Sequence, residues 1–488
     1  MLESPSPHRD IEVMLKAYRI LVNNRFTVKT PQGTTHTFTT PSLTDGAGNS
    51  HLDYGGKQWL WDSAAHIMNL AHTEPEVAKL EFRALLAHQT LDAENPDHGF
   101  VPHMNYFHGD GRKVPEWVKA HYARFLDREG FTLVGEEERD DFCSTYWSHD
   151  YHSDITQPPL LAMAALELYE VDQDKGFLAE IFPALVHYYD YLSRRRADSD
   201  GLVRIIHPWE SGWDNSQRWD EAIGLGRQTG PLERSRIDHR KMALFSKWKA
   251  LHWNLDAIFA SGDFSVKPVD FNVLYVKNLE CLAILAEELQ AKSQAGQLKT
   301  LAATVRETIF EKMWDGDKYA DLISGSGPEQ LSPVKSAAMF YPMMLDNEPH
   351  SEHLLKKHLA NPEEFCPPGG FLVPTTSLDD PSTPQSLLPD PNDHYWRGNV
   401  WVIVNFFVRC AVEHYLKRNP GDALAQRLSF QIRESTFELL HKQDFFEYFH
   451  PLAETRGFGV PSFGWNGLAV FMKTTPAFQT MSVKESQE

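Results

Sequence analysis

Helices that come in pairs constrain the fold of this 488-residue chain more than any other feature. Apolar side chains recur at helical spacing along successive segments, and the connections between these segments are alternately short and long. The clearest pair comprises residues 270–288 and 297–314, and residues 400–416 and 422–442 form another. Almost nothing alternates at the period of two that strands require. The pattern therefore predicts an all-α chain whose strands occur only in short loops.

The long connections indicate how these pairs are arranged. Residues 23–56 predict a long loop or a short hairpin, and two irregular stretches follow at about residues 91–154 and 362–394. We interpret both as loop excursions from a single domain over residues 1–488, because no linker-like break separates the helices. A ring of six helical hairpins would gather the long loops on one face, where functional residues usually lie. A helical superhelix is the alternative, and it predicts a repeat period that we do not find.

The composition argues against several classes of partner. A net charge of −20 without a basic stripe disfavours nucleic acid. The four cysteines, Cys143, Cys281, Cys366 and Cys410, are far apart and form no CxxC motif, so we expect reduced thiols. The first residues, MLESPSPHRD, lack the pattern of a signal peptide, and no run of 18 apolar residues occurs. We therefore expect a cytoplasmic protein without a membrane partner.

The segment HPWESGWDNSQRWD, residues 207–220, concentrates groups that do chemistry. Three carboxylates (Glu210, Asp214 and Asp220) alternate there with three indoles (Trp209, Trp213 and Trp219). Indole faces stack on the apolar faces of sugar rings, and carboxylates exchange protons. A buried strand would not carry three carboxylates, because each unpaired buried charge is costly. This central motif is therefore interpreted as the wall of a polar, aromatic-lined pocket.

Four further polar and aromatic clusters lie in the other connections. They are QWLWDS from Gln58, SDITQPP from Ser153, DHYWRGNVW from Asp393 and FEYFHP from Phe446. One cluster alone could be an ordinary helix start, with Asp62 as its cap and Trp59 and Trp61 as core residues. Five clusters at the ends of helical hairpins are instead typical of a site that recognises sugars.

Hydrolysis of a glycosidic bond requires two carboxyl groups that flank the bond. Asp214 lies beside an aromatic residue in a partly dry loop, which should raise its pKa and suit a general acid. Glu447 lies in an aromatic run near the end of the chain and could activate water. Glu210 and Asp220 are alternative candidates. Their other possible roles are to hydrogen-bond sugar hydroxyls or to brace the loop.

Together, these motifs resemble glycoside hydrolase family 63 and share features with its trehalase relatives. The resemblance rests on HPWESGWDNSQRWD, QWLWDSAAH, SDITQPP, YWRGNVW and the ending FFEYFHP with GFG and FGW, and it covers about residues 40–473. It implies an (α/α)6 barrel, a toroid of six hairpins with long loops on the active-site face. It also implies an inverting hydrolase of α-linked sugars, with Asp214 as general acid and Glu447 as general base. We expect no metal and no redox cofactor.

The same resemblance implies a set of sugar-binding residues. Those that match the family's sugar-site positions are Trp59, Asp62, Gln157, Trp396, Arg397 and Asn399. From the clusters themselves we add Trp61, Trp209, Glu210, Trp213 and Tyr395. Larger family members carry a β-sandwich before the barrel, for which this chain has no room. It is more similar to the branch of mannosylglycerate and glucosylglycerate hydrolases.

That branch implies a small anionic leaving group, so a cation should face it. Arg218, Arg234, Arg236 and Arg240 are close to the central motif in sequence, and the sequence does not choose among them. Other functions also remain open. One is an α-glucosidase acting on an α-linked disaccharide or oligosaccharide.

A function of another class is a sugar isomerase or epimerase on a similar barrel. Such enzymes use paired histidines, for which His207 and His450 are the candidates. A sugar-binding scaffold would have lost one of the two catalytic carboxylates, and both are present here. The expected partner is a small sugar substrate, and a homo-oligomer is possible.

Overall fold

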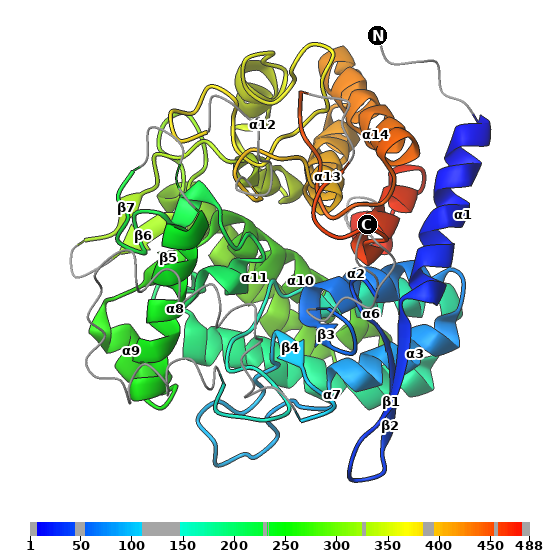
Figure 1. Ribbon diagram of the computed structural model, residues 1–488, viewed down its shortest axis with the longest axis vertical. Coiled ribbons are helices and arrows are strands. Elements are labelled where there is room, and N and C mark those ends of the chain that lie inside the picture. The colour runs from blue at the N-terminus through cyan, green and yellow to red at the C-terminus, as the bar shows by residue number, and fades with distance from the viewer. Residues whose placement is uncertain are drawn as a thin grey trace.

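Two layers of helices form a closed ring in the computed structural model (Figure 1). The structure describes residues 7–43, 54–109, 147–227, 232, 234–324, 328–383, 395–452 and 457–480. Within them, the inner layer comprises α2 (Leu60–Ala71), α6 (Leu161–Asp172), α10 (Val269–Glu288), the 3₁₀ helix η4 (Ala337–Met344), α13 (Val402–Arg418) and the 3₁₀ helix η7 (Gly464–Met472). Each packs against the next in chain order, and η7 packs against α2. The last inner element therefore closes the ring on the first.

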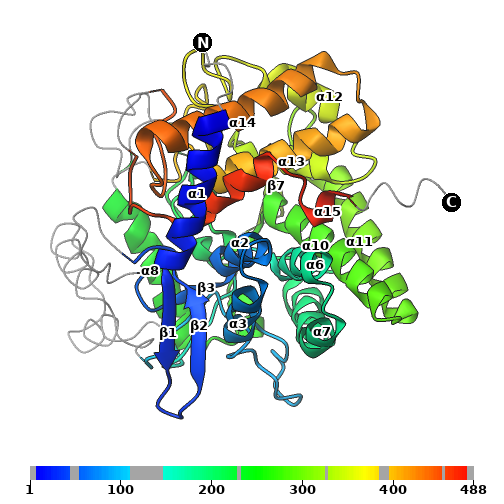
Figure 2. The ribbon, with the colours of Figure 1, turned by 90° about the vertical axis from the view of Figure 1, so that its right-hand side faces the viewer.

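The outer layer follows the same order. It comprises α3 (Pro75–Leu85), α7 (Lys175–Tyr191), α11 (Lys292–Lys312), α12 (Ser351–His353) with the π-helix η5 (Leu354–Leu359), and α14 (Ala423–Gln443). The sixth outer position belongs to α1 (Pro7–Asn23), which packs against η7 and α14 (Figure 2). The first helix of the chain thus completes the sixth hairpin with the last inner element, and the predicted (α/α)6 barrel is confirmed.

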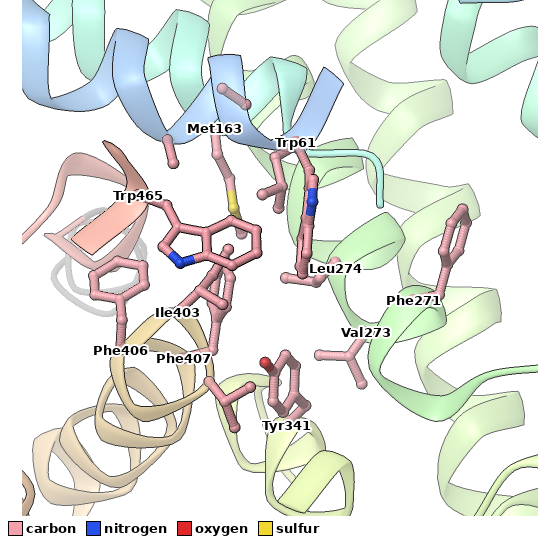
Figure 3. Packing of buried hydrophobic residues seen from close by; sticks show 14 of the residues in the cluster. Trp61, Met163, Phe271, Val273, Leu274, Tyr341, Ile403, Phe406, Phe407 and Trp465 are labelled. Carbon is pink, nitrogen blue, oxygen red and sulfur yellow. The ribbon is translucent and has the colours of Figure 1, made fainter. Parts of the chain in front are cut away.

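The apolar pattern explains which helices lie inside. Every residue of α2 is buried, and so are most residues of α10, on all sides of the helix. The outer helix α11 buries only four residues, at helical spacing, and leaves the rest partly or fully exposed. Side chains from all six inner elements meet in the centre, as Figure 3 shows for Trp61, Met163, Leu274, Tyr341, Phe407 and Trp465. This continuous core supports the loops above it.

Strands are short and peripheral in the described part of the chain. Of the two alternatives for residues 23–56, a long loop or a short hairpin, the structure has the hairpin, formed by β1 (Arg25–Lys29) and β2 (Thr35–Thr39). The other strands are β3 (Gln58–Trp59) paired with β4 (Met104–Asn105), and β5 (Ser265–Lys267) paired with β6 (Leu322–Ser324), which also pairs with β7 (Gln330–Leu331). They tie loops together rather than form a layer.

Several helix boundaries differ from those that periodicity predicts. The helix expected near Ile155 begins only at Leu161, because Pro158 and Pro159 precede it. The segment expected to be helical over 234–258 divides into α8 (Arg234–Ala250) and α9 (Leu255–Ser261). His252 and Trp253 adopt positive φ between them, which ends the first helix. A short helix, α15 (Ala477–Thr480), packs against α6.

Other expectations are tested only in part. Residues 110–146 and 384–394, which include Cys143, lie outside the described residues; what is described of the two excursions consists of turns, bridges and the short β4. Cys281, Cys366 and Cys410 are free thiols. Of the helices described, none is both long and apolar enough to cross a membrane.

Two glycines allow the ring to close. A Cβ atom on Gly464 would lie 2.3 Å from Nε2 of His66, and one on Gly467 would lie 3.1 Å from Nδ2 of Asn69. His66 and Asn69 belong to α2 and are buried. Side chains larger than hydrogen would therefore separate η7 from α2.

Gly464→Ala should lower the free energy of unfolding by about 1–3 kcal/mol, because the new methyl group must displace a buried ring. Thermal or urea unfolding measures the change. Gly296→Ala in α11 is the control, since nothing lies within 4 Å of its Cβ position. That variant should be neutral or more stable by up to about 1 kcal/mol. An unchanged stability of Gly464→Ala would contradict this account of ring closure.

Candidate active site

The central motif folds into two short 3₁₀ helices, η2 (Pro208–Ser211) and η3 (Gln217–Trp219), and the turn between them carries Asp214. Gly212 precedes this turn with a φ of 75°. A Cβ atom on Gly212 would lie 2.5 Å from the indole of Trp61. Only glycine therefore lets the turn approach α2 this closely, which fixes Asp214 beside the first inner helix.

Two of the motif's three carboxylates are committed to buried arginines. Glu210 accepts hydrogen bonds from the guanidinium of Arg196, at the end of the π-helix η1 (Leu192–Arg196), and from the backbone N–H groups of Thr156 and Ile206. Asp220 accepts two bonds from Arg397, at 2.9 and 2.6 Å.

These pairs disagree with two predictions of sugar contact. Glu210 is fully buried and both of its oxygens are occupied, so it braces the loop. Arg397 is also buried, and it holds Asp220 and the carbonyl of Asn215. Their partners lie outside their own motifs or are backbone groups, which is why neither motif alone revealed them.

A third buried arginine anchors the motif to the ring. Arg218 donates to Asp270 at the start of α10 and to Asp321 just before β6, with distances of 2.5 to 2.9 Å. Its guanidinium is fully buried between the two carboxylates. Arg218 is therefore not available as the cation for an anionic leaving group.

Asp214 differs from its neighbours in the motif. It is half-buried, and in the described part of the chain it forms no hydrogen bond or ion pair. Burial raises the pKa of Asp214 to about 7. The positive charges of Lys241 and Arg234 oppose this rise, and the negative charge of Glu447 adds to it. A group of this kind holds a proton for much of the time at neutral pH.

Glu447 is held by two tyrosines. Its Oε1 accepts hydrogen bonds from the hydroxyls of Tyr54 and Tyr395, at 2.9 and 2.7 Å. Burial raises the pKa of Glu447, and these hydrogen bonds oppose the rise by favouring the charged form. Gly459, with a φ of 73°, permits the surrounding turn, since a Cβ atom there would lie 2.3 Å from Oε2 of Glu447.

Asp62 is a third carboxyl in the same electrostatic neighbourhood. Burial raises its pKa well above the ordinary value, and the charges of Glu447 and Asp214 add to the effect. The same two charges raise the pKa values of Tyr54 and Tyr395, whose largest cause is again burial. Side chains from four distant parts of the chain therefore gather around one point.

The predicted aromatic residues divide into two groups. Trp61, Trp213 and Trp396 are almost completely buried, and Trp396 stacks on Trp401 with ring centroids 3.5 Å apart. Trp59, Trp209 and Tyr395 are half-buried.

Two predicted amides are buried and contact the backbone of Trp61 and Tyr395. Gln157 accepts a hydrogen bond from the backbone N–H of Trp61 at 3.3 Å. Asn399 donates to the carbonyl of Tyr395 at 3.0 Å, and its buried Oδ1 has no partner among the described residues. That oxygen can still accept a hydrogen bond from a hydroxyl group.

Tyr54 and Lys241 are residues that the sequence analysis missed. Tyr54 lies in the polar segment 23–56, where no motif marks it. Lys241 lies in α8 and contacts both Asp238 and the amide oxygen of Asn215. A cationic side chain one helical turn after Asp238 looks like an ordinary surface ion pair in the sequence.

The histidines required by an isomerase are both occupied. Nε2 of His207 lies 3.1 Å from the carbonyl of Lys241, and Nδ1 accepts from the N–H of Trp209. Burial lowers the pKa of His207 well below its ordinary value. Nδ1 of the buried His450 accepts from the N–H of Leu452. Both rings contact backbone groups, so these two histidines do not form the acid–base pair that an isomerase would need.

The (α/α)6 fold, with carboxyl groups gathered among half-buried aromatic rings, defines a glycoside hydrolase. The family model described as the mannosylglycerate hydrolase MGH1-like glycoside hydrolase domain matches residues 55–466. This chain belongs to that family.

Characterised relatives align over most of the chain. The mannosylglycerate hydrolase of Thermus thermophilus is 28% identical over 442 residues, which cover 85% of this chain and 93% of the relative. The glucosylglycerate hydrolase of Mycolicibacterium hassiacum is 26% identical over 71% of this chain and 78% of its own. A similar solved structure is the crystal structure of the family 63 mannosylglycerate hydrolase from Thermus thermophilus in complex with Tris and D-glycerate. Its sequence is 26% identical, and the match covers 95% of this chain and 100% of that chain. The two structures superpose with a TM-score of 0.67.

Asp214→Asn should stabilise the protein at neutral pH and have less effect in acid. The pKa of about 7 in the folded protein exceeds the value of about 3.9 for an unfolded aspartate. Between these values the folded state binds more protons, so this group lowers the free energy of unfolding as the pH rises. Asparagine does not titrate. The difference in unfolding midpoint between variant and wild type should therefore grow from about pH 4 to about pH 7 and then level off.

Thermal unfolding across that pH range measures the difference. Glu221→Gln is the matched control, because it removes an exposed carboxylate directly after the motif. Its difference from wild type should stay nearly constant. A constant difference for Asp214→Asn would show that Asp214 does not carry the raised pKa.

Proposed function

We propose that this protein hydrolyses, with inversion, the α-glycosidic bond between a hexose and glycerate, in mannosylglycerate or glucosylglycerate. The observation that carries the proposal is the contrast between two carboxyl groups. Asp214 has a pKa of about 7 and no ion-pair partner in the described chain, whereas Glu447 receives two tyrosine hydrogen bonds. One group is suited to give a proton and the other to take one.

In the proposed reaction, Asp214 protonates the glycosidic oxygen as the bond to the anomeric carbon breaks. A water molecule attacks that carbon from the opposite face and gives its proton to Glu447. The tyrosines occupy Oε1 of Glu447, whereas Oε2 receives, from the described residues, only a long bond of 3.4 Å from the N–H of Val460. Oε2 is therefore the oxygen that we assign to the water. This single displacement requires a carboxyl separation of roughly 6.5–9.5 Å and inverts the anomeric configuration.

The sugar would be held by polar and aromatic groups around this pair. We assign its hydroxyls to Asp62, Gln157 and Asn399, and its apolar face to Trp59, Trp209 or Tyr395. The buried indoles of Trp61, Trp213 and Trp396 would support these groups from behind. A buried, unpaired acceptor such as Oδ1 of Asn399 favours a ligand hydroxyl as its partner.

For the carboxylate of the leaving group we propose Arg234. Its guanidinium lies 5.0 Å from the centre of the Tyr395 ring, and its charge acts on both Asp214 and Glu447. Arg236 is exposed, and Arg218 is locked between two aspartates. Of the four candidate arginines, including Arg240, Arg234 is the one that is among the main charges acting on both Asp214 and Glu447.

The function is tested by incubating the protein with mannosylglycerate, glucosylglycerate, trehalose, kojibiose and nigerose. Proton NMR should show that the β-anomer of the hexose appears first, from a glycosylglycerate and not from the disaccharides. Asp214→Asn and Glu447→Gln should lose nearly all turnover while remaining folded. Faster hydrolysis of a disaccharide would favour an α-glucosidase instead. Initial release of the α-anomer would exclude inversion.

Arg234→Ala should raise KM for the glycosylglycerate about 10- to 100-fold, because a hydrogen bond to a charged group contributes about 1.5–3 kcal/mol. The KM for a neutral α-hexoside should change much less. Arg236→Ala removes an exposed charge two residues away and is the control, with kinetics expected to match wild type. Equal losses on the charged and neutral substrates would argue against the assignment of Arg234.

A further inference from the structure

Three metal-binding side chains converge in the outer layer, on elements that take no part in the candidate active site. Asp317 lies in the turn after α11, His353 ends α12, and His358 lies in the π-helix η5. Oδ1 of Asp317 is 2.8 Å from Nε2 of His353 and 3.3 Å from Nε2 of His358. All three donor atoms lie within 4.8 Å of one another.

The π-helix is what brings the two histidines together. Residues five apart are about 140° from each other around an α-helix, so they point in different directions. The wider turn over Leu354–Leu359 places His353 and His358 on one side. Single π-helical turns are rare and frequently occur at functional sites.

A second group of contacts orients His358. Its Nδ1 lies 2.7 Å from Oε2 of Glu364, and Lys335 in turn donates to Oε1 of that glutamate at 3.1 Å. Both His358 and Glu364 are buried. In the tautomer whose Nδ1 proton points to Glu364, the lone pair of Nε2 faces Oδ1 of Asp317. A metal ion can bind between these two atoms.

We propose that Asp317, His353 and His358 bind a zinc ion, with Glu364 as the carboxylate that orients His358. Zinc takes two imidazoles and a carboxylate readily, at about 2.0–2.2 Å, and its donors then lie about 3.3 Å apart. The separations of 2.8 and 3.3 Å need only small shifts to meet this geometry. A carboxylate that holds the second nitrogen of a ligating histidine is the usual outer partner of a zinc site. The fourth position would hold water.

The ion would join the third and fourth hairpins of the ring. Asp317 belongs to the end of the third, whereas His353 and His358 belong to the outer element of the fourth. Lys357 competes for the same site, since its ammonium group lies 2.5 Å from Oδ1 of Asp317. Lys357 is more than half exposed and can leave when the ion arrives.

The test is zinc binding by the full-length protein after treatment with a chelator, followed by competition with a zinc-sensitive dye and by the visible spectrum of bound Co²⁺. We expect one equivalent of zinc. His353→Ala and Asp317→Asn should weaken binding at least about 100-fold, and Glu364→Gln about 10-fold. Lys357→Ala should bind zinc several times more tightly, because it removes the competing charge. Thermal unfolding with chelator present checks that every variant is folded.

His350→Ala is the matched control. His350 is a neighbouring histidine that stacks on Trp314 with ring centroids 3.8 Å apart and is not one of the three donors. Its variant should bind zinc as wild type does. Absence of stoichiometric binding to the wild type, unchanged binding by Asp317→Asn, or equal losses in His350→Ala and His353→Ala would overturn the proposal.

Discussion

Buried arginine–carboxylate pairs hold the central motif, and the position of Asp214 depends on them. The pairs are Arg196 with Glu210, Arg218 with Asp270 and Asp321, and Arg397 with Asp220. They attach one short loop to η1, to α10 and to the segment that begins at Tyr395. Removal of one partner leaves a buried charge uncompensated and typically costs about 3–5 kcal/mol. A loop held at three places cannot easily move its catalytic candidate.

The presence or absence of a hydrogen-bonded arginine separates Asp214 from the other acids of the motif. Glu210 and Asp220 are buried with a guanidinium beside each, whereas Asp214 is half-buried with its nearest cations acting through charge alone. Burial raises the pKa of both Asp214 and Asp220, but only Asp220 has a hydrogen-bonded guanidinium that directly opposes the rise. The pairs thus hold the loop that carries Asp214, and Asp214 itself forms no ion pair within the described part of the chain.

Periodicity in the sequence predicted the paired helices and their ring, because helical spacing is a local property. It could not predict that α1 would pair with η7 across the whole chain. The sequence also left four arginines as equal candidates for the leaving group. Arg218 is excluded only by its ion pairs with Asp270 and Asp321, which lie 52 and 103 positions beyond it in the sequence. Tyr54 was missed because a single tyrosine in a polar loop carries no pattern.

Glycines near the carboxyl groups allow close backbone contacts, as do the glycines that close the ring. Gly212 and Gly459 bring backbone against Trp61 and Glu447 at distances that exclude a Cβ atom. Ring and loops are therefore both built on close backbone contacts, which tolerate little variation.

The cations that act on Asp214 come instead from α8, which is not one of the twelve ring elements. Changes in α8 can accordingly alter the charge around the acid, and with it the preferred leaving group, while the ring stays intact.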